Sequence, residues 1–553
     1  MCGIHALISP AISPLSQPRD LDSVSPELRR VLVARGPDHF GQACRKSNGW
    51  TLRFTSTVLA LRGDHITRQP LESDNGSVLC WNGEAWRVNG QRIQAEANDA
   101  EVVLKLLVNV GSSAPGDERL ETLLNALRAI EGPFAFVYYD YPAETLIYGR
   151  DRLGRRSLVL RQDGDELELC SVAGSLGNGW QEVEADGIYV ARLKTQGGLD
   201  ISRCPWIVGD KTADFTYSAF HQVFGLGRFN KTQPFGNPQL TRFSTSVTML
   251  KEQLLESIRL RILNIPVPPS TDGRTRLSVL FSGGLDCTVL ARLCHEVLDP
   301  DQAIDLLNVA FENPRVVAQL KNGADGTLSD FYEACPDRIT GRRSFAELQK
   351  VNIPYAETLA HRQQVISLIY PHNTEMDLSI AYALYFAARG QGFCTDSSAF
   401  NTVPKPYTSP ARVLLSGLGA DELFGGYSRH LSAFQQRGYV GLVDELLLDV
   451  GRLGKRNLGR DDRVMSHWGK EVRFPFLDER LVRWAIETPS WEKCDFANGE
   501  DVTGVEANKR ILRLLALELG MEGVAREKKR AIQFGSRTAK MESGRVKGTT
   551  LIS

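Results

Sequence analysis

A Ser-Gly-Gly loop between an apolar run and an apolar helix constrains the fold of this chain more than any other segment. The run before the loop, RLSVLF (276–281), has no polar alternation, which is typical of a strand buried on both faces. Two more such runs, IDLLNVAF (304–311) and RVLLSG (412–417), follow with helical patterns between them. Because strands that alternate with helices form parallel sheets, these residues predict a parallel α/β domain.

The segment before residue 195 has a different pattern. Alternating, aromatic-rich runs such as 77–90 and 131–151 are broken by Gly, Asn and Pro, and one helix is expected over 100–110. Such runs are typical of stacked antiparallel sheets. The 553 residues also exceed what one hydrophobic core can organise, so about two to four domains are expected.

The domain boundaries follow from these changes of pattern. We place a first domain at residues 2–195, a linker containing Gly and Pro at 196–243, the α/β domain at 244–540 and a polar tail at 541–553. The α/β domain begins with a helix, because apolar residues at three-to-four spacing share one helical face: Val247, Leu250, Leu254, Ile258 and Ile262.

The composition excludes several functional classes. With 42% hydrophobic residues, 24% charged residues and a formal net charge of −1, the chain gives no reason to expect nucleic acid or a membrane as partner. No apolar run approaches the ~20 residues of a membrane helix, and the start lacks the features of a signal peptide. The ten Cys are scattered, without CxxC pairs or metal-ligand spacing, as in a reducing compartment. We therefore expect a cytoplasmic protein.

Cys2 is a candidate nucleophile because it follows the initiator Met. Removal of the Met would leave a thiol beside a free α-amine, whose pKa near ~7.7–8.0 suits it to act as the base for that thiol. Any residue can follow Met, so the position of Cys2 alone carries little weight.

Other polar residues of the first domain have a functional and a structural interpretation. Asn82 and Gly83 follow an apolar strand and can form an oxyanion hole or a β-turn. Asp99 precedes a helix and is either a ligand-binding carboxylate or an N-cap. Arg35 and Arg62 are either substrate ligands or solvated surface charges.

Taken together, these segments resemble the class II glutamine amidotransferases. The similarity runs in order through MCGI, RGPD, QPL (69–71), NGE, the ND before a helix, GPFAFVYYD and GRDRLGRRSL (149–158), and so covers the whole first domain. It implies an N-terminal nucleophile αββα sandwich that hydrolyses glutamine. The implied roles are nucleophilic attack by Cys2, oxyanion binding by Asn82 and Gly83, and glutamine binding by Arg62, Asn82, Glu84 and Asp99.

The Ser-Gly-Gly loop of the second domain has the features of a phosphate site. Ser282, Gly283 and Gly284 lie between a strand and a helix, where exposed backbone N–H groups and the helix dipole favour an anion. Asp286 can bind Mg²⁺ on the phosphates. The loop is not a Walker A motif, and a plain Gly-Gly turn is the structural alternative.

SGGLD resembles the pyrophosphate-binding loop of the ATP pyrophosphatases, and LLSGLGADELFGGYSRH (414–430) resembles the SGEGSDE loop of asparagine synthetases. The resemblance implies a Rossmann-like domain that uses ATP and Mg²⁺ to adenylate aspartate. It implies Asp286 and Asp421 as metal ligands and Lys529 as the catalytic lysine. It also implies nucleotide contacts at Ser282, Gly283, Gly284, Asp286, Cys287, Ser416 and Gly417.

The wording of several segments, among them PDRITGR (336–342) and KRAIQFGSR (529–537), is closest to a branch of that family, the asparagine synthetase domain-containing proteins. Two positions depart from the synthetase pattern. Cys287 replaces a Ser, and Leu418 replaces the first Glu of SGEGSDE.

Two hypotheses about function stay open. The first is an enzyme that takes nitrogen from glutamine, passes ammonia internally and makes asparagine, glutamate, AMP and pyrophosphate. The second is a divergent member with another acceptor, or a non-catalytic regulatory protein that binds nucleotide or glutamine. A homodimer is the candidate assembly, and no protein partner is indicated.

Overall fold

The structure is a computed structural model. It describes all residues except 1, 12–23, 175, 195–197, 208–224, 270, 322–327, 346–348, 395–403, 500–503, 542–546 and 553. The chain forms two compact units. The first unit contains Met1–Ala213, Ser367–His372 and Leu453–Lys470, and the second contains Asp214–Ile366, Asn373–Arg452 and Glu471–Ser553.

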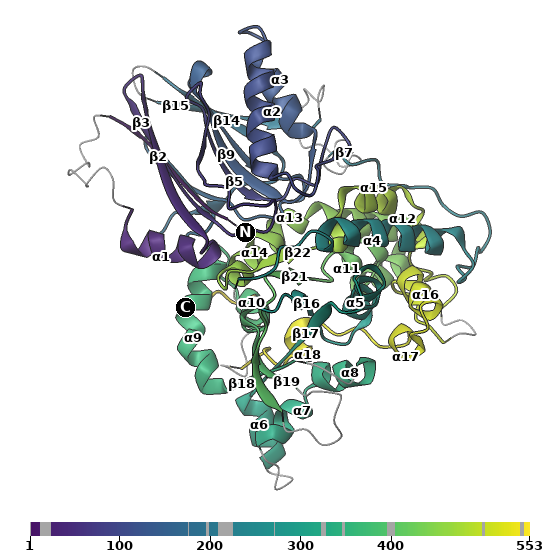
Figure 1. Cartoon of the computed structure of the whole chain (residues 1–553). Coiled ribbons are helices and arrows are strands. Elements are labelled where there is room, and N and C mark those ends of the chain that lie inside the picture. Colours follow the sequence, from purple (N-terminus) through teal and green to yellow (C-terminus); the bar gives the residue numbers. More distant parts are fainter. Residues whose placement is uncertain are drawn as a thin grey trace. The chain divides into compact units, whose positions relative to one another are not determined.

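The first unit contains two antiparallel sheets, visible at the N-terminal, purple-to-blue end of the colour scale in Figure 1. One sheet has the order β13-β11-β12-β1-β3-β2, and its strands are β1 (Gly3–Pro10), β2 (His39–Ser47), β3 (Trp50–Val58), β11 (Val159–Asp163), β12 (Glu166–Cys170) and β13 (Gln181–Glu182). The other has the order β15-β14-β10-β9-β5-β4, and its strands are β4 (Leu71–Glu72), β5 (Val78–Gly83), β9 (Phe134–Asp140), β10 (Thr145–Arg150), β14 (Gly187–Leu193) and β15 (Leu199–Pro205). A small third sheet joins β6 (Arg87–Val88), β7 (Gln91–Arg92) and β8 (Ile130–Glu131).

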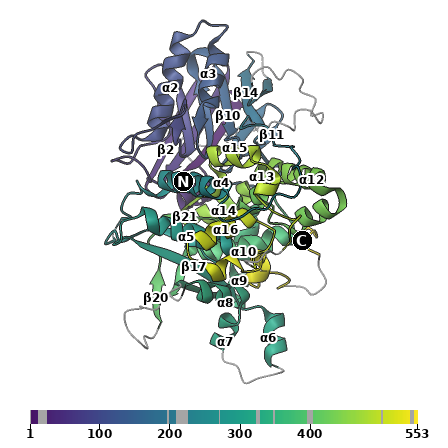
Figure 2. The same cartoon turned by 90° about the vertical axis from the view of Figure 1, so that its right-hand side faces the viewer.

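Two apolar cores organise this unit into layers. Alternate residues of the two large sheets face each other in the first core, for example Ile4 and Phe54 with Val137 and Leu146. The second core lies between the outer face of the β5–β9 sheet and helices α2 (Asp99–Ser113) and α3 (Arg119–Arg128). Figure 2 shows α2 and α3 side by side along that sheet. Helix α1 (Pro26–Arg35) packs on β1 and β3, which completes a helix–sheet–sheet–helix arrangement.

The second unit is built on a seven-stranded sheet of order β20-β19-β18-β17-β16-β21-β22. Its strands are β16 (Thr275–Leu280), β17 (Ala303–Phe311), β18 (Gln349–Ile353), β19 (Gln391–Cys394), β20 (Lys405–Thr408), β21 (Val413–Leu415) and β22 (Glu471–Arg473). The strands from β18 to β22 in this order pair in parallel, whereas β19 and β20 form an antiparallel hairpin at the edge. Fully apolar runs such as Val413–Leu415 suit strands covered by helices on both faces.

Helices cover both faces of this sheet, and Figure 1 shows α5 and α10 near β16 and β17. The helices of the second unit are α4 (Thr245–Ile262), α5 (Leu285–Val297), α6 (Pro314–Lys321), α7 (Leu328–Glu333), α8 (Pro336–Ser344), α9 (Tyr355–Ile369, whose last three residues belong to the first unit), α10 (Glu375–Arg389), α11 (Ala420–Phe424), α12 (Ser428–Gly451), α15 (Glu479–Glu487), α16 (Arg510–Glu518), α17 (Glu522–Ala525) and α18 (Ile532–Gly535). Helices α13 (Leu453–Arg456) and α14 (Leu458–Ser466) belong to the first unit, and the short 3₁₀ turns are η1 (Tyr141–Ala143), η3 (Pro475–Leu477) and η4 (Ser490–Glu492).

The predicted fold class is confirmed. The three apolar runs form the parallel strands β16, β17 and β21, and the first segment forms antiparallel sheets. The helix expected from residue 244 is α4, and the five apolar residues of its predicted face are at most 1% exposed.

Two boundaries differ from the prediction. Strand β15 lies inside the span 196–243 that the sequence predicts to be a linker, and it pairs along its length with β14. Leu453–Lys470 belongs to the first unit, although the pattern assigns it to the 244–540 domain. Part of the predicted polar tail, 541–553, contacts the start of α10: Leu551 forms a β-bridge with Thr374, and the Met376 amide donates to the Gly548 carbonyl.

In the described part of the chain, no helix is both long enough and apolar enough to cross a membrane. All ten Cys are free thiols.

Leu254→Ala tests the buried face of α4. The side chain is fully buried, and α4 packs on α5 and α16, so removing its methyl groups should leave a cavity and lower Tm by roughly 5–10 °C. Glu252→Ala on the exposed face of the same helix is the matched control and should shift Tm by less than about 2 °C. Equal shifts in thermal unfolding would contradict this assignment of the two faces.

Candidate active sites

Cys2 lies directly before β1, among side chains from two other strand ends. Its backbone nitrogen donates to Oδ1 of Asn82 at 3.0 Å, and the Nε2 of Gln69 lies 3.7 Å from its Sγ. The residue is 7% exposed. The Cys2 backbone is therefore fixed by a hydrogen bond, and the residue keeps a small area exposed to solvent.

Asn82 has one amide atom satisfied and one that is not. Its Oδ1 accepts from Cys2, whereas its Nδ2 has no hydrogen-bond partner among the described residues although the side chain is completely buried. An unsatisfied buried donor costs about 1–3 kcal/mol unless another group uses it. A donor beside a nucleophile is the arrangement of an oxyanion hole.

Asn82 and Gly83 form the end of a strand rather than a β-turn. Both residues pair with β9, and Gly83 has a φ of +147°. A Cβ at Gly83 would lie 2.0 Å from the carbonyl oxygen of Pro133, so only glycine fits this close approach. The Gly83 backbone therefore reaches the site without a side chain in the way.

Asp99 is not the cap of α2, because Asn98 occupies that position and accepts from the amides of Ala100 and Glu101. The Asp99 carboxylate instead accepts from Trp81 Nε1 at 2.9 Å and from the Ala85 amide at 2.8 Å. It therefore ties the start of α2 to the segment that follows β5.

Arg62 is not a freely solvated surface charge. Its guanidinium donates to four main-chain carbonyls, those of Ala85, Ile93, Gln94 and Ala97, and its Nη1 lies 3.4 Å from a carboxylate oxygen of Glu84. These contacts bring Arg62 and Glu84 together. The glutamine-binding roles of Arg62, Glu84 and Asp99 stay predictions.

Gln69 is a site residue to which the sequence assigned no role. Its Oε1 accepts from the Trp81 amide at 2.8 Å, while its Nε2 faces the Cys2 thiol. The QPL segment was the only signal for it, and the contact with Cys2 depends on the pairing of strands far apart in the chain.

In the second unit, the predicted phosphate loop joins β16 to α5. Gly283 has a φ of +79°, and a Cβ there would lie 2.4 Å from the backbone of Gly341 in α8. The Ser282 hydroxyl accepts from the Gly284 amide at 3.3 Å. The loop is thus a tight backbone turn at the start of α5, the end of a helix that favours an anion.

Cys287 lies one turn into α5 and faces the main chain. Its thiol donates to the Gly284 carbonyl at 3.3 Å and lies 3.6 Å from the Ser282 hydroxyl. Burial raises the pKa of this thiol, so it remains protonated. The predicted contact of Cys287 with nucleotide stays a prediction.

Asp286 and Asp421 meet at one ammonium group. Lys509 Nζ lies 2.8 Å from Asp286 Oδ1 and 3.0 Å from Asp421 Oδ1. Burial favours the neutral form of Lys509, but the two carboxylates outweigh it and raise its pKa. Sequence patterns did not single out Lys509, since the KR of NKRILR reads as an ordinary solvated pair.

Lys529 joins the same group of charges. Its Nζ lies 2.8 Å from Asp421 Oδ1 and 3.7 Å from the centre of the Tyr427 ring. Burial opposes ionisation of Asp421, but the Lys509 and Lys529 ammonium groups outweigh it and lower the pKa of Asp421. Burial lowers the pKa of Lys529 itself.

Glu422 is buried beside Asp421 and accepts from the Tyr427 hydroxyl at 2.6 Å. Burial, together with the neighbouring charge of Asp421, raises its pKa to about 7. Tyr427 therefore contacts both residues, Glu422 through its hydroxyl and Lys529 through the face of its ring.

Two converging carboxylates fit what Mg²⁺ requires from a protein that also binds a nucleotide. Mg²⁺ keeps several waters and uses one or two carboxylates plus substrate phosphates. Asp286 and Asp421 supply that number of carboxylates, and both lie within ion-pair distance of a single point, the Lys509 ammonium. No cluster of three or more such side chains occurs in the residues that the structure describes.

Ser416 and Gly417 follow β21 and lie behind Asp286. The Ser416 amide donates to the Arg473 carbonyl at 3.0 Å, which ties the loop to β22. A Cβ at Gly417 would lie 2.9 Å from Asp286 Cβ, so the loop approaches α5 closely. The Leu418 amide donates to the Ser416 hydroxyl at 3.3 Å, and its apolar side chain is partly buried.

Comparison with known proteins covers both units. Residues 1–193 match the glutamine amidotransferase domain, and residues 270–444 and 435–549 match asparagine synthase. The bovine asparagine synthetase domain-containing protein 1 is 32% identical over 99% of this chain and 97% of its own length. A Saccharomyces cerevisiae asparagine synthetase domain-containing protein is 33% identical over 94% of this chain and 90% of its own.

The chain belongs to the asparagine synthetase domain-containing protein family. The resemblance noted in the sequence is thereby confirmed along nearly the whole chain. A probable glutamine-hydrolysing asparagine synthetase of Schizosaccharomyces pombe is more distant, 23% identical over 90% of this chain and 78% of its own length. In this member of the family, the residues around Cys2 lie in the part that matches the amidotransferase domain, and those around Asp286 and Asp421 lie in the part that matches asparagine synthase.

Glu422→Gln should change stability in a pH-dependent way. A carboxyl with a raised pKa binds its proton more tightly when folded, so the folded state loses stability as pH rises from 4.5 to about 7. The neutral amide avoids this loss, so Tm of the variant should exceed that of the parent by roughly 3–8 °C at pH 8. The difference should shrink as pH falls toward about 5.

Thermal unfolding at several pH values measures this effect. Glu252→Gln, on the exposed face of α4, is the control and should give no pH-dependent difference. A Tm difference for Glu422→Gln that is the same at pH 5 and pH 8 would show that ionisation of Glu422 is not its cause.

Proposed function

We propose that this protein is a glutamine-dependent amidotransferase that consumes ATP. Glutamine would be hydrolysed in the first unit, and the ammonia would replace an adenylate on a carboxylic acid bound by the second. The observation that carries the proposal is the unsatisfied, fully buried Nδ2 of Asn82 beside Cys2. Aspartate, giving asparagine, is the acceptor that the synthetase resemblance favours.

The first half-reaction uses the Cys2 thiol. After removal of Met1, the α-amine of Cys2 would accept the thiol proton, and the sulfur would attack the glutamine amide carbon. Asn82 Nδ2 and the Gly83 backbone amide would bind the oxyanion. Collapse of the tetrahedral intermediate, with a proton returned to the leaving nitrogen, would release ammonia and leave a thioester, which water would hydrolyse to glutamate.

The second half-reaction uses the group around Asp286 and Asp421. Amides of the Ser282–Gly284 loop would hold the β- and γ-phosphates of ATP, while Lys529 would stabilise charge on the phosphate during transfer. A carboxylate oxygen of the acceptor would attack the α-phosphorus and displace pyrophosphate. Ammonia would then attack the acyl carbon and release AMP.

Asp286 and Asp421 would hold Mg²⁺ in this reaction, and the ion would neutralise the negative charge of the phosphates. The Lys509 ammonium already forms ion pairs with both carboxylates, at 2.8 and 3.0 Å. The side chain of Lys509 would therefore have to move or share these ligands when metal and nucleotide bind.

Leu418 favours a second candidate function. A leucine cannot accept a hydrogen bond or carry charge, and it occupies the loop position where asparagine synthetases carry a Glu. The loop geometry is otherwise supported by contacts of its neighbours, including the Leu418 amide with Ser416. A protein that binds nucleotide or glutamine in a regulatory role, or that uses another acceptor, would also fit this substitution.

Cys2→Ala and Asn82→Ala test the glutaminase half. Pyrophosphate release from ATP would be measured with Mg²⁺ and aspartate, and with glutamine or ammonia as the nitrogen source. Cys2→Ala should abolish glutamine use, and Asn82→Ala should lower it by about 10²- to 10³-fold because one oxyanion donor is lost. Both variants should retain ammonia use.

Asn109→Ala, an exposed asparagine of α2, is the matched control and should behave as the parent. Equal glutamine use by Asn82→Ala and the parent would contradict the oxyanion role. A folded parent that uses neither nitrogen source would instead support the regulatory alternative.

Leu418→Glu tests the acceptor. If aspartate is the acceptor and the missing carboxylate limits the rate, this variant should raise aspartate-dependent pyrophosphate release by at least tenfold, in line with the 10²- to 10⁴-fold that a positioned acid–base group typically contributes. Leu418→Gln has the same size without the charge, and its rate should rise much less. No change in either variant would point to another acceptor or to the non-catalytic role.

A further inference from the structure

Helix α14 is fully buried although it carries four charged residues in a row. All of Leu458–Ser466 is buried, including Arg460, Asp461, Asp462 and Arg463. Burying a charge is costly unless the charge is paired and hydrogen-bonded. The partners of these charged residues therefore indicate which contacts the helix stabilises. Asp462 pairs with Arg35 and Arg463 with Glu182, and both partners belong to the first unit, as α14 does.

Arg463 docks the helix. Its guanidinium donates to the carbonyls of Leu368 and Ile369 at 2.9 and 3.0 Å, to the Ser157 hydroxyl at 2.8 Å, and to the Glu182 carboxylate. These contacts do not involve Asp462. The position of α14 therefore does not depend on the Asp462 carboxylate alone.

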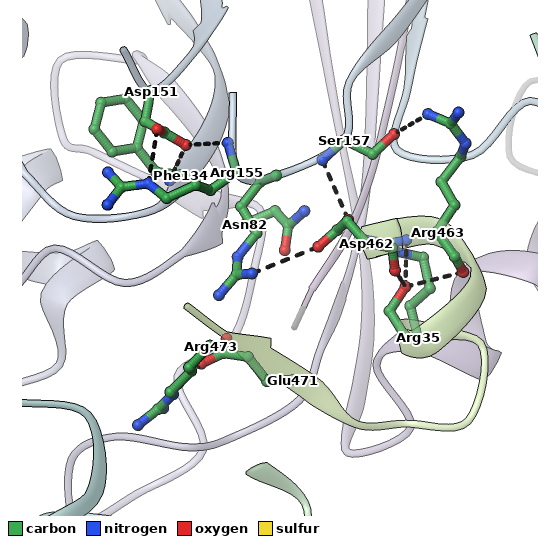
Figure 3. Close-up of polar contacts among 12 residues, drawn as sticks. Arg35, Asn82, Phe134, Asp151, Arg155, Ser157, Asp462, Arg463, Glu471 and Arg473 are labelled. Atoms are coloured by element: carbon green, nitrogen blue, oxygen red, sulfur yellow. Dashed lines mark hydrogen bonds and ion pairs between the residues drawn. The ribbon is translucent and has the colours of Figure 1, made fainter. Parts of the chain in front are cut away.

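Asp462 accepts two hydrogen bonds, forms a longer ion pair with a second arginine, and has no exposed surface. Its Oδ2 accepts from Arg35 Nη2 at 2.8 Å and from the Ser157 amide at 3.2 Å, and its Oδ1 lies 3.5 Å from Arg156 Nη1. Figure 3 shows Arg35 and the Ser157 segment converging on this carboxylate. The segment is itself fixed, because Asp151 accepts from the backbone and side chain of Arg155 at 2.8 and 2.9 Å.

Arg35 connects this carboxylate to the candidate nucleophile. It ends α1 and is 1% exposed. Its Nη1 donates to the Ser466 hydroxyl of α14 at 2.5 Å, and its Nε lies 3.5 Å from the Cys2 carbonyl oxygen. The Cys2 backbone is thus held at its nitrogen by Asn82 and at its carbonyl by Arg35.

We infer that Asp462 is a positioning residue for glutamine hydrolysis, because it orients Arg35 and through it the backbone of Cys2. The inference rests on the proposed function. Asp462 lies 427 residues from Arg35 in the chain, within the stretch that matches asparagine synthase rather than the amidotransferase domain. Residues 1–193 therefore do not contain all the groups that set the nucleophile.

Asp462→Asn in the full chain tests the inference. The amide keeps the shape and an acceptor for the Ser157 amide but removes the charge that holds Arg35. Because a misplacement of about 1 Å can cost about a hundredfold, kcat for glutamate release from glutamine should fall by about tenfold to a hundredfold. KM for glutamine should change by less than about threefold, since Asp462 touches none of the predicted glutamine ligands.

Two controls separate positioning from general destabilisation. Asp461→Asn alters a neighbouring buried carboxylate that pairs with Arg460 at 2.7 Å, and it should leave kcat within about twofold of the parent. Arg35→Gln should lower kcat at least as much as Asp462→Asn, and the double variant should be no worse than Arg35→Gln alone. Additive losses would mean that Asp462 does not act through Arg35.

Ser466→Ala keeps the test decisive if Asp462→Asn does not fold, because it removes the other contact of α14 with Arg35 and leaves the Asp462 carboxylate in place. The hydroxyl also donates to the carbonyls of Asp462 and Arg463, but both of these bonds lie within α14. It should lower kcat by a smaller factor, about threefold to tenfold, with KM unchanged. A parent that releases glutamate no faster than Cys2→Ala would overturn the proposed function and the inference together. An active parent with a kcat unchanged in Asp462→Asn, or in Ser466→Ala where only that variant folds, would overturn the inference alone.

Discussion

The ion pair between Asp462 and Arg35 is the interaction on which the order of the first unit's candidate site depends. Arg35 is buried at the end of α1, so its charge needs a carboxylate, and the structure supplies one from helix α14. Removing one partner of such a pair typically costs about 3–5 kcal/mol, because it leaves a buried charge uncompensated. The same guanidinium lies 3.5 Å from the Cys2 carbonyl oxygen, so the ion pair also bears on the position of the candidate nucleophile.

In the second unit the charges are arranged in the opposite way, with carboxylates grouped around a cation. Here two partly buried carboxylates, Asp286 and Asp421, share the ammonium group of Lys509, and Lys529 adds a second cation. Charges arranged in this way suit a site that must exchange partners, since a divalent ion and phosphates can replace the interactions that the lysines make. Glu422 lies next to Asp421, and burial raises its pKa to about 7, so its protonated, neutral form is more populated than that of an ordinary carboxyl.

Secondary structure and burial were predictable from the sequence wherever they depend on residues that are close together in the chain. The buried runs became parallel strands, and the apolar face of α4 is buried as its spacing indicates. Strand β15 was missed because its residues alternate weakly and it lies at a sheet edge, where only pairing with β14 marks it. Lys509 and Asp462 carry no local signal, and the QPL segment gave Gln69 no role, since each residue acquires its role from a partner at least 67 residues away.

The sequence by itself determined the fold class, the order of the two domains and most of the candidate site residues, because these depend on motifs whose members are neighbours in the chain. Only the tertiary structure decided which of those residues meet. It placed the Asn82 amide beside Cys2, both metal-binding candidates on one lysine, and a helix from residues 458–466 in the first unit. The physical reason is that a buried charge or donor needs a partner in space, and spatial partners are set by strand order and packing rather than by sequence spacing.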